Sequence, residues 1–247
     1  MSAGTGATGR VSGGSSASAG GHDGRGGDAI RGLYGMVDVS ASPGRSHVEI
    51  THSLLAAGSR VMQLRMKEAT DEEHEAVLRR ILPLCAAAGA ALLLDDRLEM
   101  AARWPGVGVH LGACDASPEE ARRILGPRRL VGLSTASVAE VRAAHEARRP
   151  VDYLGFGPIF SAAGKHRAPG DSRPETPALG VTALREALCV ARVPLVAIGG
   201  ITLPRLASVL ATGVAAVAII GAVTTADDME SAARAVVRAF SERDGSE

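Results

Sequence analysis

Residues 61–95 read VMQLRMKEATDEEHEAVLRRILPLCAAAGAALLLD. The two ends of this stretch, Val61–Arg65 and Ala91–Asp95, are short and mostly apolar, which is typical of strands, while Glu72–Ala88 between them repeats apolar residues at helical spacing. Strands that are apolar on nearly every position are expected where both faces are buried, as in a parallel sheet. The stretch therefore predicts a strand–helix–strand unit with parallel strands.

The same pattern recurs along the rest of the chain. Further strand-like runs are Leu33–Val37, Val107–Leu111, Leu130–Ser134, Asp152–Phe156, Pro194–Ile198 and Ala215–Ile220. The helical patterns between and after the strands include Pro118–Leu125, Val138–Ala147, Thr182–Ala191, Pro204–Ala211 and Asp227–Phe240. Eight strand–helix units in about 215 residues predict an α/β fold of the (β/α)8 TIM-barrel type, in a single domain. An open doubly wound sheet would need a glycine-rich turn after its first strand, and residues 37–40 contain no glycine.

The N-terminal residues differ from the remainder in composition. Residues 1–28 are mostly Gly, Ser, Ala and Thr, with too few apolar side chains to offset the entropy cost of ordering. We therefore expect a disordered tail over residues 1–28, followed by the barrel domain over residues 29–247.

Composition excludes several classes of function. The 27 basic and 27 acidic residues balance, so the 247-residue chain has no basic surface that predicts nucleic-acid or membrane binding. Neither a membrane-spanning apolar run nor a signal peptide is apparent, which predicts a cytoplasmic protein. Three widely spaced cysteines cannot form a disulfide framework. The oligomeric state stays open, with a homo-oligomer among the possibilities.

Polar residues gather where the expected strands end, which is where barrel enzymes place their chemistry. Only two of the 27 basic residues are lysines, Lys67 and Lys165, and Gln63 is the single glutamine; all three fall at strand ends or in the loop that follows. Lysine and arginine suit phosphoryl oxygens. Asp96 and Asp115 supply the few hard oxygen ligands that Mg²⁺ requires beside a phosphate. The pattern predicts a phosphate and Mg²⁺ site that binds small-molecule substrates.

Structural explanations exist for several of these side chains. Arg65 and Arg97 could each pair with a neighbouring carboxylate, and Asp95 with Asp96 could cap a short helix that follows them. His110 ends an apolar run, so it is more often a hydrogen-bonded core histidine than a catalytic base.

Six short motifs, in this order and spacing, resemble those of the thiamine phosphate synthase family, which are (β/α)8 enzymes. The motifs are Gln63–Lys67, Asp95–Arg97, Val109–Gly112, Gly132–Thr135, Gly155–Phe160 and Ala197–Thr202. The resemblance extends from about Leu33 to Ala235. It implies a transferase that joins hydroxymethylpyrimidine diphosphate to a thiazole phosphate carboxylate, with release of diphosphate and carbon dioxide.

The resemblance also implies roles for individual residues. Asp96 and Asp115 would hold Mg²⁺, and Lys67, Ser134 and Lys165 would be the catalytic groups. Substrate contacts would come from Gln63, Leu64, Arg65, Met66, Lys67, Asp95, Ser134, Ala162, Ala163, Gly164, Lys165, Gly200, Ile220 and Gly221.

Departures from the family pattern leave two alternatives open. Asp95 stands where the family usually has Asn, and residues 161–165 lack the hydroxyl groups of the usual Pro-Thr-x-Thr-Lys loop. These differences are compatible with a non-catalytic paralogue that binds a phosphate ligand. A thiazole tautomerase would need a histidine near the end of the fifth strand, where Ala136 stands.

Overall fold

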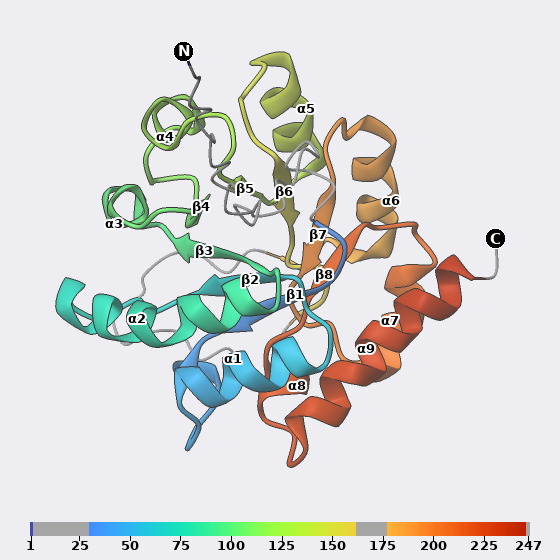
Figure 1. The fold of residues 1–247 in the computed structure, drawn as a ribbon. Coiled ribbons are helices and arrows are strands. Elements are labelled where there is room, and N and C mark those ends of the chain that lie inside the picture. Colours follow the sequence, from blue (N-terminus) through green and yellow to red (C-terminus); the bar gives the residue numbers. More distant parts are fainter. Residues whose placement is uncertain (2–29, 162–176, 246–247) are drawn as a thin grey trace.

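Eight short parallel strands close into a barrel in the computed structural model of this protein, which describes residues 1, 30–161 and 177–245 (Figure 1). Each strand pairs with its neighbours in chain order, and the last strand closes on the first. The strands are β1 (Gly32–Val37), β2 (Val61–Leu64), β3 (Ala91–Asp95), β4 (Gly108–Leu111), β5 (Val131–Thr135), β6 (Tyr153–Phe156), β7 (Leu195–Ile198) and β8 (Ala216–Ala218). The predicted (β/α)8 barrel is confirmed, whereas the tail predicted for residues 1–28 lies almost wholly outside the described residues.

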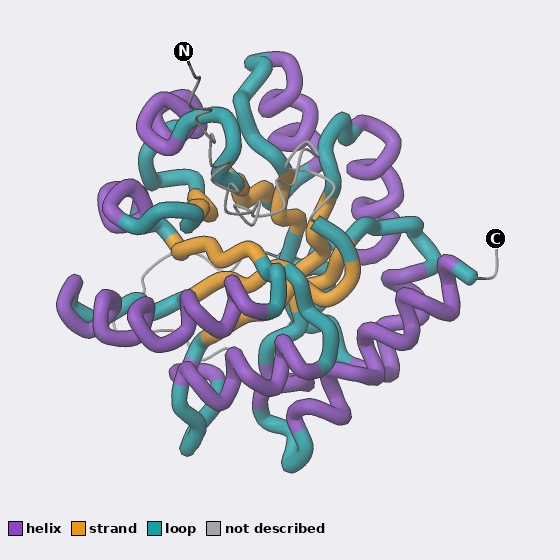
Figure 2. Tube along the Cα trace, in the orientation of Figure 1, coloured by secondary structure: helices purple, strands orange, loops and turns teal. Residues whose placement is uncertain are grey.

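Helices surround the strands on the outside of the barrel (Figure 2). They are α1 (His47–Ala56), α2 (Asp71–Ala87), α3 (Leu98–Arg103), α4 (Pro118–Leu125), α5 (Val138–Glu146), α6 (Gly180–Val190), α7 (Leu203–Leu210), α8 (Gly221–Thr224) and α9 (Met229–Asp244), with a short 3-10 helix, η2 (Val39–Ala41). Asp95 and Asp96 do not cap α3, because Arg97 is its N-cap residue and makes no side-chain cap bond. Within the described ranges, no helix is both long enough and apolar enough to cross a bilayer.

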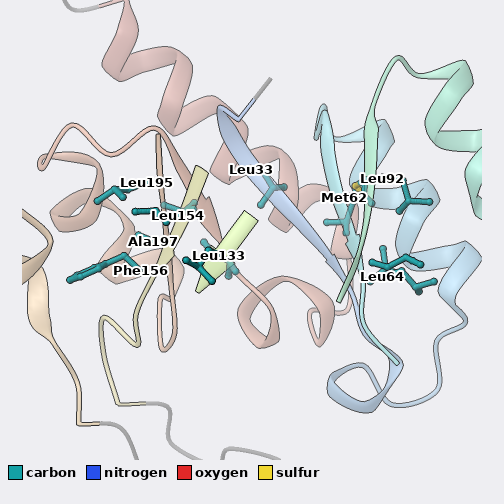
Figure 3. Close-up of a cluster of buried hydrophobic side chains, with 14 of the residues drawn as sticks. Leu33, Met62, Leu64, Leu92, Leu133, Leu154, Phe156, Leu195 and Ala197 are labelled. Atoms are coloured by element: carbon teal, nitrogen blue, oxygen red, sulfur yellow. The ribbon is translucent and has the colours of Figure 1, made fainter. Parts of the chain in front are cut away.

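Apolar side chains on the two faces of the strands form separate cores. The outer core lies between the strands and the helices and includes Leu33, Met62, Leu64, Leu92, Leu133, Leu154, Phe156 and Leu195 (Figure 3). The inner core fills the barrel and includes Ile30, Tyr34, Met36, Val61, Leu93, Leu130, Tyr153, Val196, Ala216 and Ala218. Because successive residues of a strand point to opposite faces, β1, β2, β3, β6, β7 and β8 each contribute to both cores, while β4 and β5 contribute apolar side chains to the outer core. This explains the near-continuous apolar runs in the sequence.

Two glycines make room for aromatic rings inside the barrel. A Cβ atom at Gly132 in β5 would lie 2.2 Å from Cζ of Tyr153, and one at Gly155 in β6 would lie 3.2 Å from Cε1 of His110. The absence of these two methyl groups lets Tyr153 and His110 lie across the barrel, toward the ends of the strands.

Candidate active site

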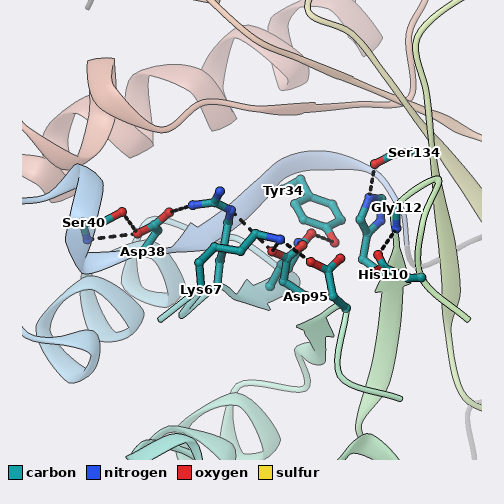
Figure 4. Close-up of polar contacts among 12 residues, drawn as sticks. Tyr34, Asp38, Ser40, Lys67, Asp95, His110, Gly112 and Ser134 are labelled. Atoms are coloured by element: carbon teal, nitrogen blue, oxygen red, sulfur yellow. Dashed lines mark hydrogen bonds and ion pairs between the residues drawn. The ribbon is translucent and has the colours of Figure 1, made fainter. Parts of the chain in front are cut away.

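A line of polar side chains crosses the barrel at the carboxyl ends of its strands (Figure 4). Nε2 of Gln63 in β2 donates to Oδ1 of Asp95 in β3 at 2.7 Å. Oε1 of the same amide accepts from the hydroxyl of Tyr34 in β1 at 2.8 Å. The Tyr34 and Tyr153 hydroxyl oxygens lie 2.6 Å apart.

The line continues through His110 to Ser134. Nδ1 of His110 lies 2.8 Å from the Tyr153 hydroxyl, and Nε2 lies 2.9 Å from Oγ of Ser134. Burial lowers the pKa of His110, since a charged imidazolium would lose its hydration. Both ring nitrogens are hydrogen-bonded inside the barrel, as expected for a core histidine.

The two basic residues at the end of β2 are paired with carboxylates. Nη1 of Arg65 lies 2.5 Å from Oδ2 of Asp38, and its Nε lies 3.4 Å from Oδ2 of Asp95. Nζ of Lys67 lies 2.9 Å from the same Asp95 oxygen and forms a second ion pair with Asp96. The pairing interpretation of Arg65 is therefore confirmed, and the pairs keep both cations at the barrel mouth.

Arg97 lies in a separate network on the outside of the mouth. Its Nη1 pairs with Oδ1 of Asp71 at 2.7 Å, and its Nη2 donates to the carbonyl oxygen of Ala69. The pairing interpretation is confirmed for this arginine as well.

Asp96 and Asp115 face each other across the backbone of Gly112. The Gly112 N–H donates to Oδ2 of Asp115 at 2.6 Å. Burial and a hydrogen bond with Asp96 raise the pKa of Asp115 to about 6, so this carboxyl group lies in surroundings with little compensating positive charge. A divalent cation would supply that charge, and two carboxylates with water and phosphate are a usual Mg²⁺ donor set. The described residues hold no group of three or more His, Cys, Asp or Glu side chains arranged for a metal.

Glycines shape the opposite side of the mouth. Gly199 and Gly200 both have positive φ values, 95° and 62°, and a Cβ atom at Gly200 would lie 2.4 Å from the carbonyl oxygen of Phe160. Only glycine allows the backbone after β7 to approach this closely. Ile220 and Gly221 stand at the junction of β8 and α8.

Some predicted substrate contacts are not side-chain contacts of the mouth. The Leu64 side chain belongs to the outer core, and Met66 packs half-buried against it. Ala162, Ala163, Gly164 and Lys165 lie outside the described residues, so their predicted roles stay predictions.

A cavity of about 170 Å³ opens beside the line of polar side chains. Its lining includes the polar residues Tyr34, His110, Ser134, Glu140 and Tyr153 and the apolar residues Ala136, Val196, Ile198 and Ala218. It is mostly apolar with a few polar atoms, which suits a flat heteroaromatic ring. Ala136, the position at which the resemblance would require a histidine in a thiazole tautomerase, lines this cavity with its methyl group.

Three residues of the site were not predicted from the sequence: Tyr34, Tyr153 and Asp38. The two tyrosines are the only ones in the chain, and each stands inside a predicted strand. A polar aromatic residue within an otherwise apolar strand was therefore the signal that could have identified them. Asp38 directly follows β1, and its position at a strand end was a comparable signal.

The chain is similar in sequence and in fold to known thiamine-phosphate synthases. The family model TMP-TENI, described as thiamine monophosphate synthase, matches residues 33–223. A thiamine-phosphate synthase of Methanoculleus marisnigri is 38% identical over 83% of this chain and 92% of its own length. Another, of Parasynechococcus marenigrum, is 37% identical over 81% of this chain, and the matched region spans only about half (54%) of that relative. The solved thiamine phosphate pyrophosphorylase from Pyrococcus furiosus has a TM-score of 0.75 and 29% identity, covering 87% of this chain and 97% of that one.

Proposed function

This chain belongs to the thiamine monophosphate synthase family and is a transferase of thiamine biosynthesis, and we propose that its barrel mouth binds the pyrimidine diphosphate together with Mg²⁺. The transferase joins hydroxymethylpyrimidine diphosphate to a thiazole phosphate carboxylate and forms thiamine phosphate. The thiazole nitrogen attacks the pyrimidine methylene carbon, and diphosphate leaves with the electron pair of the broken C–O bond. Carbon dioxide leaves the thiazole part, and one proton taken up from water completes the product.

An excess of negative charge at the mouth is the observation that carries the Mg²⁺ proposal. Four carboxylates meet two cations there, which leaves a net charge of −2 on the described side chains Asp38, Asp95, Asp96, Asp115, Arg65 and Lys67. A diphosphate brings further negative charge to this region. Coulomb repulsion would oppose its binding unless a cation lies between the carboxylates and the phosphoryl oxygens.

Three charged residues of the mouth and the cavity beside them have a part in this proposal. Asp96 and Asp115 hold Mg²⁺, which when bound neutralises the charge that develops on the departing diphosphate. Lys67 lies against both Asp95 and Asp96 and is thus placed to donate to a phosphoryl oxygen. The apolar cavity holds the pyrimidine ring and positions its methylene carbon for attack.

Replacement of either metal-binding carboxylate tests the proposal. Asp96→Asn and Asp115→Asn keep the shape of the side chain but remove a charged ligand. The rate of diphosphate release should therefore fall at least about 100-fold, which is the usual loss when a group that stabilises developing charge is removed. Affinity for Mn²⁺, measured by its paramagnetic resonance signal, should fall in the same variants. Diphosphate release is measured with each substrate omitted in turn.

Asp71→Asn provides the matched control, because Asp71 is an exposed carboxylate that pairs with Arg97 and Arg103 outside the mouth. We expect this variant to retain Mn²⁺ binding and turnover. Normal turnover in the presence of EDTA by both mouth variants would exclude the metal site, and binding of the pyrimidine diphosphate without turnover by the unaltered protein would instead indicate a non-catalytic binder.

A further inference from the structure

In the line of hydrogen bonds from Asp95 to Ser134, the donor and the acceptor of each bond can be assigned. We call this order of donors and acceptors the direction of the line, and it follows from the first residue, Asp95. Asp95 forms an ion pair with Lys67 at 2.9 Å, so it enters the line as a carboxylate, which accepts hydrogen bonds and donates none. The amide nitrogen of Gln63, and not its oxygen, must therefore face Asp95. The Gln63 oxygen then faces Tyr34 and can only accept.

The tyrosines carry this direction across the barrel. Since the Tyr34 proton is used in the bond to Gln63, the Tyr34 oxygen can only accept from Tyr153. The Tyr153 proton is then used in turn, so the contact at 2.8 Å between Tyr153 and Nδ1 of His110 needs a proton on Nδ1. Both tyrosines are buried, so a hydroxyl proton left without one of these partners would cost free energy.

The position of the proton on His110 decides whether the Ser134 hydroxyl donates to the ring or accepts from it. The two ring nitrogens of His110 face hydroxyl groups, Nδ1 that of Tyr153 and Nε2 that of Ser134, and neither faces a carboxylate that would pair with an imidazolium. The ring is therefore neutral, with a proton on one nitrogen and a lone pair on the other. With the proton on Nδ1, Nε2 accepts from the Ser134 hydroxyl at 2.9 Å. Ser134 is exposed to the cavity, and only its oxygen lone pairs remain for a ligand.

We propose that Asp95 fixes the direction of this line, so that His110 is the Nδ1–H tautomer and Ser134 is an acceptor for the exocyclic amine of an aminopyrimidine. Tyr34, Tyr153 and Gln63 are positioning residues, because they act on the substrate through His110 and Ser134. The inference rests on the proposed function for the identity of the ligand. The tautomer itself is a property of the protein without substrate.

Nitrogen NMR of the full chain labelled with ¹⁵N-histidine tests the tautomer directly. Seven histidines contribute signals, and the spectrum of His110→Gln identifies those of His110. At neutral pH we expect a protonated Nδ1 and an unprotonated Nε2. A ring protonated on Nε2, alone or together with Nδ1, would overturn the proposal, since Ser134 would then be free to donate, for example to the diphosphate.

Tyr34→Phe tests whether the donor order is passed along the line, because Tyr34 is hydrogen-bonded to Tyr153 and Gln63 and not to His110. A change at His110 in this variant cannot come from a lost direct hydrogen bond. Without the Tyr34 oxygen, the Tyr153 proton can turn to Nδ1, and the Nε2–H tautomer of His110 should become populated. The isosteric Asp95→Asn should have the same effect, because an amide in that position allows Gln63 to reverse. Unchanged His110 signals in both variants would contradict the proposal.

Ser59→Ala is the matched control, since Ser59 is a buried hydroxyl that bonds to the carbonyl oxygens of Leu33 and Val61, away from the line. It should leave the His110 tautomer unchanged.

In steady-state kinetics, Tyr34→Phe should raise the KM for the pyrimidine diphosphate about 2- to 10-fold, the range for one neutral hydrogen bond. The KM for the thiazole phosphate should not change. Equal changes in both KM values would overturn the assignment of the pyrimidine to Ser134. The NMR result needs no turnover, so it can fail or succeed independently of the proposed reaction.

Discussion

At Gly112 the backbone N–H donates to Asp115, and the missing side chain leaves room for the same carboxylate. A Cβ atom at this position would lie 2.9 Å from Oδ2 of Asp115 and 3.9 Å from Oδ1 of Asp96. Gly112→Ala should move the Asp115 carboxylate, the free end of a side chain, without disturbing the fold. Loss of such an orienting contact commonly weakens metal binding about 10- to 100-fold.

We therefore expect Gly112→Ala to raise the Mn²⁺ dissociation constant by that factor, while the melting temperature changes by less than about 3 °C. Titration calorimetry and thermal unfolding on the same sample measure the two quantities. An unaltered Mn²⁺ affinity would show that Asp115 does not need this position to bind the metal.

The sequence indicated the residue types of the site but not their partners. Lys67, Asp96 and Asp115 were predicted from their places at strand ends, and the structure brings them together. The contact between Tyr34 and Tyr153 joins residues 119 positions apart and depends on the closure of the barrel. Such a pair has no local pattern, because strand alternation shows which face a residue occupies but not which residue it meets there.

Helix α2 begins with a capping box that can be tested separately from the site. The Thr70 hydroxyl accepts from the Glu73 N–H, and the Glu73 carboxylate accepts from the Thr70 N–H. Thr70→Ala removes one of these bonds and should lower the free energy of unfolding by about 1 kcal/mol. Urea denaturation measures the loss. Thr70→Ser keeps the hydroxyl and should lose much less, and equal losses in the two variants would mean that the cap is not the cause.

Most elements were predicted within a few residues, and the exceptions have physical reasons. Helix α2 and strands β1 to β8 carry strong apolar patterns. Helix α1 was not predicted, and it buries the polar Thr51 beside Ile50 and Leu54, which weakens the apolar periodicity. Helix α8 has four residues, too few to show a helical period.

The two buried tyrosines make the stability of the whole barrel depend on pH. Burial raises the pKa of Tyr34 and Tyr153 above the value near 10 of the unfolded chain. The folded state therefore keeps both protons at a pH where the unfolded state has lost them. Their contribution is fully present below pH 10 and is lost above it, by about 1.4 kcal/mol per pH unit for each tyrosine.

Urea denaturation between pH 9 and pH 11 should show this decline in the free energy of unfolding. Cys85 adds a smaller part from a lower pH, since burial raises the pKa of its thiol to about 11. The Tyr34→Phe, Tyr153→Phe double variant should retain only the decline due to Cys85 and other groups. The same slope in both proteins would refute the assignment to the tyrosines.

Closure of β8 on β1 also has a consequence for how the chain can be ordered. It brings the beginning and the end of the described barrel together, and Nη2 of Arg31 lies 2.6 Å from Oδ2 of Asp244 at the end of α9. Adjacent ends are the condition under which a protein tolerates circular permutation. The eight strand–helix units thus form a cycle, which a short linker between residues 30 and 245 would join and a cut in a surface loop would reopen. Chains that begin at different surface loops of this cycle should therefore fold to the same barrel.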